Sequence, residues 1–97
     1  MIMHVLTFTW NDAATDEKVA ALALALREFA STDGAADTFA CGPDLGLRPG
    51  NADFGLVATF ADQATFRAYL DHPAHQRIVQ EQVLPILKDR AGVQLAG

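Results

Sequence analysis

The order of two apolar periodicities along the chain constrains its fold more than any other feature. Residues 2–10 and 53–60 are rich in β-branched and aromatic side chains and alternate with the period of two that is typical of β-strands. Neither face of 2–10 carries a charge, so we expect both faces of this strand to be at least partly covered. Shorter strands are predicted at 36–41 and 90–95.

A helix is predicted between the first two strands. Thr15 is a suitable N-cap, and Asp16 and Glu17 place negative charge in the first turn, where the helix dipole favours it. Apolar residues then recur at spacings of three and four as far as Phe29, before the Ser31-Thr32-Asp33-Gly34 stop. One face of this helix is therefore expected to be buried.

A second helical region follows the third strand. Asp62 is expected to cap a helix that ends before Pro73, and Pro73 suits the first position of a further helix. Pro85 removes the N–H that would bond to the Glu81 carbonyl, so a kink is predicted near Glu81. Glycines and prolines make 42–52 an irregular loop, which we expect near the opening of a pocket.

The resulting order, β-α-β-β-α-β, predicts an α+β ferredoxin-like domain spanning residues 1–97. Its four-stranded antiparallel sheet would carry the helices on one face. The other face, which includes Met3, Val5 and Val57, would then be apolar and uncovered. Leaving it exposed forfeits several kcal/mol at about 25 cal/mol per Å², so we expect a second copy to cover it in a homodimer that forms a dimeric α/β barrel.

Composition narrows the function classes. The chain has a formal charge of −5 and no basic stripe, so nucleic acid is not an expected partner. No apolar run approaches the roughly 20 residues of a membrane span, so a membrane is not an expected partner. Cys41 is the single cysteine, which favours a location in the reducing cytoplasm.

Chemistry-bearing side chains cluster around the Pro73 break. Tyr69 precedes it and His75 follows it, so both can face the sheet, where His4 shares a strand face with other inward residues. We predict one mainly apolar pocket for a small apolar or aromatic ligand. Besides these three polar residues, its predicted lining is Leu6, Phe8, Leu56, Ile78 and Val79.

Two motifs carry a family resemblance. They are His4-x-Leu6-x-Phe8 and Tyr69-x-x-His72-Pro73-x-His75. With them the chain resembles the stress-responsive dimeric α/β-barrel (Dabb) family over nearly its whole length. The resemblance implies a dimeric barrel and, by similarity to the plant polyketide cyclase that makes olivetolic acid, an acid–base pair of Tyr69 and His75 with His4 in the pocket. It implies no cofactor.

The side chains leave several functions open. One is a cofactor-independent cyclase, lyase or isomerase acting on a polyketide-like or aromatic substrate, with His75 and Tyr69 catalytic. Another is a non-catalytic stress-responsive protein that binds or protects a ligand, its histidines satisfied by structural hydrogen bonds. A heme- or oxygen-linked monooxygenase is disfavoured, because no heme or flavin motif is present. No metal site is expected, because nothing evidently completes the His72-x-x-His75 pair.

Overall fold

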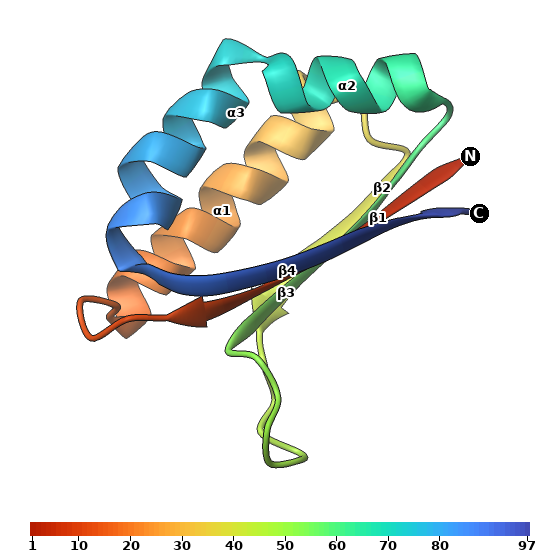
Figure 1. Ribbon diagram of the computed structural model, residues 1–97. Helices are drawn as coiled ribbons and strands as arrows, with labels where there is room; N and C mark the ends of the chain where they lie inside the picture. Colours follow the sequence, from red (N-terminus) through yellow and green to blue (C-terminus); the bar gives the residue numbers. More distant parts are fainter.

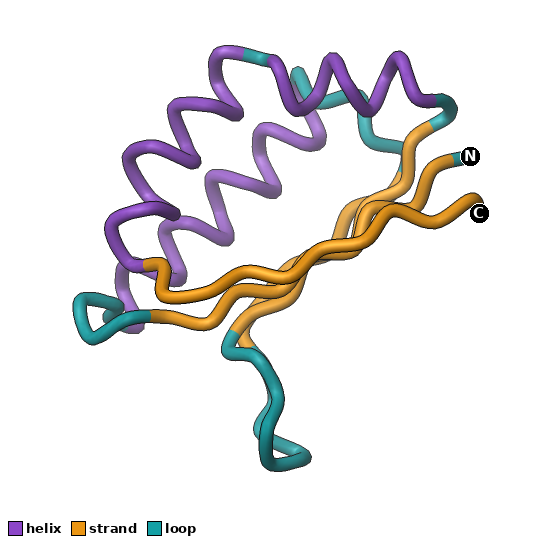
Figure 2. Tube along the Cα trace, in the orientation of Figure 1, coloured by secondary structure: helices purple, strands orange, loops and turns teal.

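The predicted order of strands and helices is confirmed in the computed structural model, which describes residues 1–97 (Figure 1). The strands are β1 Ile2–Trp10, β2 Thr38–Pro43, β3 Phe54–Phe60 and β4 Leu87–Ala96. The helices are α1 Asp16–Thr32, α2 Gln63–Asp71 and α3 Pro73–Ile78. Figure 2 shows two layers, with all three helices on one face of the sheet.

The sheet is antiparallel, with the strand order β2-β3-β1-β4. In the two central strands Val5 pairs with Val57 and Leu6 pairs with Leu56. Because side chains alternate across a strand, this register directs the even-numbered residues of β1 and β3 toward the helices. Phe8, Phe54, Leu56, Ala58 and Phe60 are buried there, which confirms the predicted inward face.

The helices begin at the predicted caps. Thr15 Oγ1 accepts a hydrogen bond from the Lys18 N–H at 3.2 Å, and Asp62 Oδ1 accepts one from the Thr65 N–H at 2.8 Å. These bonds satisfy N–H groups that have no partner inside the first turn of a helix. None of the helices is both long enough and apolar enough to cross a membrane.

Regular α geometry ends at Ile78, three residues before the predicted kink at Glu81. The backbone widens into a π-helical turn at Val79–Val83 and tightens into a 3-10 turn at Leu84–Ile86. Pro85 lies in the tight turn, where its missing N–H cannot continue the α ladder. The chain then enters β4 directly.

Two strands differ in extent from the prediction. β2 begins and ends two residues later than 36–41, and β4 is ten residues long rather than the expected 90–95. β4 pairs with the whole of β1, with a register shift at Thr9/Trp10. The length of β4 is therefore set by its pairing with β1. Its own side chains are almost all exposed, so they show little of the apolar alternation from which a strand is predicted.

The loop that joins β2 to β3 does not lie where the sequence suggested. The Asp44 N–H still donates to the Asp53 carbonyl at 2.8 Å, and Asn51 Nδ2 donates to Asp44 Oδ1 at 3.2 Å. These bonds extend the hairpin, and the loop projects on the side of the sheet away from the helices (Figure 1). The prediction that 42–52 lies at a pocket opening between sheet and helices is wrong.

The face of the sheet opposite the helices is open in the single chain. Val57 is 43% exposed, Val93 50% and Leu95 48%. Val5 lies between Val57 and Val93 in the strand pairing, so these side chains form one continuous apolar strip. No charged residue interrupts the strip.

Candidate functional site

A cavity of about 110 Å³ lies between the sheet and the helical layer. All but three of its lining residues are hydrophobic, and the three exceptions are two histidines and an arginine. The cavity opens to solvent beside the exposed residues Leu70, Leu84 and Arg90. The lining consists of His4, Leu6, Phe8, Leu26, Leu56, Tyr69, Leu70, His75, Val79, Val83, Leu84, Leu87 and Arg90.

His4 enters the cavity from β1 and is buried. Gln94 Nε2 lies 3.0 Å from His4 Nδ1. An amide nitrogen only donates, so Nδ1 accepts this bond when the ring is the neutral tautomer that carries its proton on Nε2. Burial lowers the pKa of His4, and the neighbouring His75 and Arg90, which oppose a second positive charge, lower it further.

Tyr69 reaches the cavity from the last turns of α2. It is 2% exposed, and its hydroxyl is the one buried side-chain polar atom of the chain that has no hydrogen-bond partner. Burial raises the pKa of Tyr69 to about 12, so the hydroxyl stays protonated at neutral pH. The Tyr69 hydroxyl can therefore donate a hydrogen bond to a ligand that presents an acceptor.

His75 lies in the first turn of α3, which the sequence builds in two steps. Pro73 begins the helix, and His72 Nδ1 accepts a hydrogen bond from the Ala74 N–H at 3.0 Å. This bond makes His72 the N-cap of α3. Burial lowers the pKa of His75; the Leu70 carbonyl opposes this effect, and His72 adds to it. His75 is therefore neutral at physiological pH.

The Pro73 break brings Tyr69 and His75 together. Their ring centroids are 4.7 Å apart, and the Phe29 ring of α1 lies 5.3 Å from that of Tyr69 and 5.9 Å from that of His75. A neutral imidazole can accept a proton, while a protonated phenol can donate a hydrogen bond to an oxygen that gains negative charge. The arrangement has the elements of an acid–base pair.

Seven of the eight residues predicted for the pocket line this cavity. The exception is Ile78, which is buried in the core instead. Successive residues of a helix point about 100° apart, so Ile78 points away from the cavity where its neighbour Val79 points into it. No group of three His, Cys, Asp or Glu side chains is placed to hold a metal ion.

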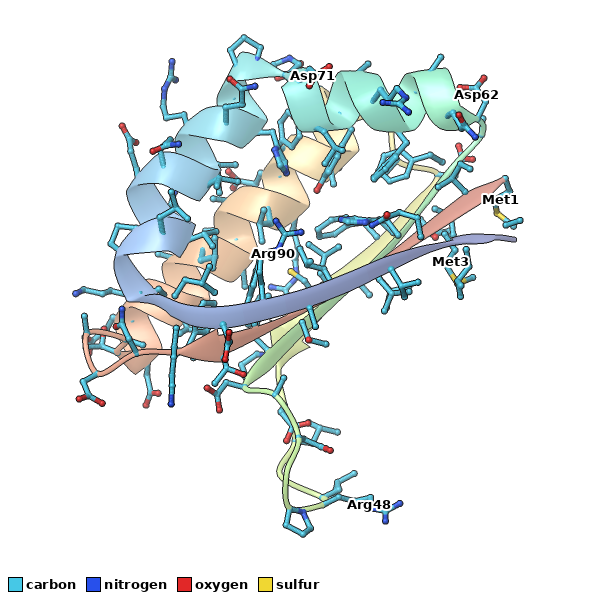
Figure 3. The ribbon with its side chains drawn as sticks, viewed as in Figure 1. Met1, Met3, Arg48, Asp62, Asp71 and Arg90 are labelled. Atoms are coloured by element: carbon cyan, nitrogen blue, oxygen red, sulfur yellow. The ribbon has the colours of Figure 1, made fainter.

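Six of the lining residues were not predicted from the sequence, and Arg90 is the charged one among them. It lies opposite Phe8 in the β1–β4 pairing and so shares the helix-facing side of the sheet. Figure 3 shows it reaching from β4 into the space between sheet and helices. The sequence signal that could have placed it is the strand period of two. Arg90, Gly92 and Gln94 are alternate residues of β4 and share one face, and Gly92 and Gln94 pair with Leu6 and His4 of the inner face of β1.

Comparison with known proteins agrees with this architecture. The chain is 39% identical to a dimeric ferredoxin-like protein of unknown function from Thermobifida fusca, with a TM-score of 0.89 over 98% of this chain and 89% of that one. It is 23% identical to a Dabb family protein from Mesorhizobium loti, with a TM-score of 0.82 over 99% and 95% of the two chains.

A plant enzyme also shares the fold. Hydroxynitrile lyase from Passiflora edulis is 13% identical, with a TM-score of 0.83 over 97% of this chain and 90% of that one. No curated protein matches this chain in sequence. The dimeric state of the Thermobifida fusca protein supports self-association of this chain.

The sequence model of the stress-responsive A/B barrel domain matches residues 2–94. This match covers both motifs that carried the resemblance, and the ferredoxin-like fold of the similar structures confirms the predicted fold class. The chain therefore belongs to the stress-responsive α/β-barrel (Dabb) domain family.

Proposed function

We propose that this protein binds a small carbonyl compound in the cavity and removes a proton from the carbon next to the carbonyl group. The observation that carries this proposal is the Tyr69 hydroxyl, which is buried without a partner beside His75. A buried unpaired polar group costs about 1–3 kcal/mol. Such a cost is reasonable where a ligand oxygen completes the hydrogen bond.

In the proposed reaction His75 is the base and Tyr69 the hydrogen-bond donor. The C–H bond breaks, its proton moves to the free ring nitrogen of His75, and the electron pair moves to the carbonyl oxygen as an enolate. Tyr69 donates to that oxygen and stabilises its charge. The enolate carbon then either takes a proton back from His75, as in an isomerase, or attacks a second carbonyl carbon, whose oxygen takes the proton from His75, as in the polyketide-cyclase-like reaction that the family motif suggests.

The cavity volume limits the substrate. Ligand pockets usually measure about 300–1,000 Å³, and a cavity of about 150 Å³ holds benzene. A volume of about 110 Å³ suits a compound of a few carbon atoms, and a six-membered ring such as that of cyclohexanone would extend partly into the opening. A longer polyketide-like chain would have to extend through the opening beside Leu84 and Arg90.

Proton exchange provides a direct test. Cyclohexanone in D₂O loses its α-protons slowly at neutral pH, and the loss is followed by proton NMR. We expect wild-type protein to accelerate the exchange, His75→Ala to lower that acceleration about 10²–10⁴-fold, and Tyr69→Phe to lower it as well. Equal exchange in wild type and His75→Ala would contradict the proposed base.

His72→Asn is the matched control. It removes a histidine three residues from His75 that does not line the cavity. Asparagine is a good N-cap, so its side-chain oxygen can accept the hydrogen bond that the Ala74 N–H donates to His72 Nδ1 in the wild type. We expect its exchange rate at pH 8 to equal that of wild type, because His75 is neutral there whether or not His72 lowers its pKa.

A non-catalytic ligand-binding role is the second candidate. The bond between Gln94 and His4 favours it, because it gives one cavity histidine a structural partner. This role predicts that cyclohexanone binds without any acceleration of exchange. An enzyme of the same fold, the hydroxynitrile lyase from Passiflora edulis, supports the catalytic alternative.

The second copy of the chain is the proposed partner of the open sheet face. The strip around Val57 and Val93 is apolar, and the loop between β2 and β3 projects on the same side. Leu45 and Leu47 in this loop are 82% and 79% exposed. Two sheets packed about a twofold axis would cover the strip and give these leucines a surface to contact.

A further inference from the structure

The cavity contains one fixed charge. Arg90 is the lone permanently charged residue of its lining, which includes no aspartate or glutamate. The whole chain, in contrast, has a formal charge of −5. A guanidinium at the mouth of an otherwise apolar cavity is therefore a local exception to the charge of the molecule.

The position of Arg90 follows from the strand pairing. Arg90 and Gly92 are opposite Phe8 and Leu6, so both belong to the inner face of β4. Gly92 has no side chain, and a Cβ atom there would lie 3.7 Å from Arg90 Nη2. The guanidinium thus lies over Gly92, along the strand and beside the cavity.

Arg90 has no partner of its own in the chain. Side-chain hydrogen bonds elsewhere include that of Arg27, whose Nη2 donates to the Cys41 carbonyl at 2.6 Å, but none involves Arg90. Its side chain is exposed, so its donors are accessible to a ligand at the opening. Its positive charge also acts inside the cavity, because it contributes to the lowered pKa of His4.

We propose that Arg90 binds a carboxylate of the ligand and that the preferred ligands of this cavity are small oxo acids. The planar fork of a guanidinium matches the two oxygens of a carboxylate. The carbonyl group of the oxo acid would lie deeper, beside Tyr69 and His75. This inference rests on the ligand site of the proposed function and specifies its substrate class.

Two ligands of similar shape test the inference. 4-Oxopentanoate has a ketone and a carboxylate, and 5-methylhexan-2-one has an isopropyl group in place of the carboxylate. Their dissociation constants are measured by following backbone amide signals in NMR titrations. This readout is binding, so it is independent of proton transfer.

We expect wild-type protein to bind 4-oxopentanoate about 10-fold more tightly than the neutral ketone, the effect of one charge-assisted contact. Arg90→Met should abolish this preference, and continued binding of the neutral ketone shows that the variant is folded. Lys88→Met is the matched control, because it removes a cation from the same strand that does not line the cavity. It should keep the preference.

The outcomes separate the two proposals. If the neutral ketone binds and 4-oxopentanoate binds no better, or if Arg90→Met keeps the preference, the inference about Arg90 is overturned and the proposed ligand site stands. If neither ligand binds wild-type protein, both are overturned. A preference that disappears with Arg90 supports the inference even where cyclohexanone exchange shows no catalysis.

Discussion

The ring of Tyr69 lies 4.7 Å from the ring of His75, at an interplanar angle of 53°. The two residues belong to different helices, α2 and α3, which meet at His72-Pro73. Phe29 of α1 contacts both rings and supports the pair from a third element. The break between the two helices therefore places the two rings side by side. The Tyr69 hydroxyl is buried there without a hydrogen-bond partner.

Tyr69→Phe should stabilise the protein while it impairs the site. The substitution removes a buried hydroxyl that has no hydrogen bond and keeps the ring that packs against Phe60. We expect the free energy of unfolding to rise by about 1 kcal/mol, measured by urea denaturation, because an unsatisfied buried group is lost. A decrease in stability would indicate that the hydroxyl has a partner, such as an ordered water.

Gly34→Ala should disturb Tyr69 from the other side. A Cβ atom at Gly34 would lie 3.0 Å from Tyr69 Cδ2 and 3.0 Å from Ala30 Cα, closer than ordinary contacts. We expect a loss of about 1–2 kcal/mol in the free energy of unfolding, as for other overpacked sites, and slower cyclohexanone exchange. Ser31→Ala, an exposed change at the same helix end, should leave the exchange rate unchanged.

Local pattern was sufficient for most of the fold and part of the site. Alternation in β1 placed His4, Leu6 and Phe8 on one face, because successive side chains of a strand point to opposite sides. Pro73 located the helix break that joins Tyr69 to His75. These features depend on a few neighbouring residues, which is why the sequence alone predicts them.

The remaining features depend on partners distant in the sequence. Arg90 reaches the cavity because the register with β1 sets it opposite Phe8, and this register includes a shift at Thr9/Trp10. Glycines and prolines predict an irregular loop at 42–52 but give no direction for it. That direction comes from the Asp44–Asp53 bond, which extends the β2–β3 hairpin beyond the sheet.

Stability should fall as the pH decreases below neutral. Burial lowers the pKa of His4 and of His75 from the ordinary value of 6.5. The unfolded chain therefore takes up protons first, so the free energy of unfolding decreases from about pH 6.5 downward, through the window between the unfolded and folded pKa values. Urea denaturation at pH 8, 7, 6 and 5 measures this decrease, and His4→Gln should reduce it. Values independent of pH between 7 and 5 would contradict the buried neutral histidines.

Activity should persist at lower pH than a free histidine would allow. The proposed base is neutral His75, whose lowered pKa moves the acid limb of the exchange rate below pH 6.5. Tyr69, with its pKa of about 12, gives no alkaline limb near neutral pH. The cyclohexanone exchange rate, corrected for the buffer reaction, is measured from pH 5 to 9. An acid limb above pH 6.5 would indicate that His75 is solvated or that another group is the base.

Val57→Asp should separate the proposed dimer. Val57 is 43% exposed in the single chain, so a carboxylate there is tolerated in a monomer but becomes buried and unpaired if a second sheet covers it. Sedimentation of the wild type should give about twice the chain mass of 10.4 kDa, and Val57→Asp should give a single chain mass. Leu24→Asp, on the exposed side of α1 and 57% exposed, should remain dimeric. A dimeric Val57→Asp, or a monomeric wild type, would show that this face of the sheet is not the interface.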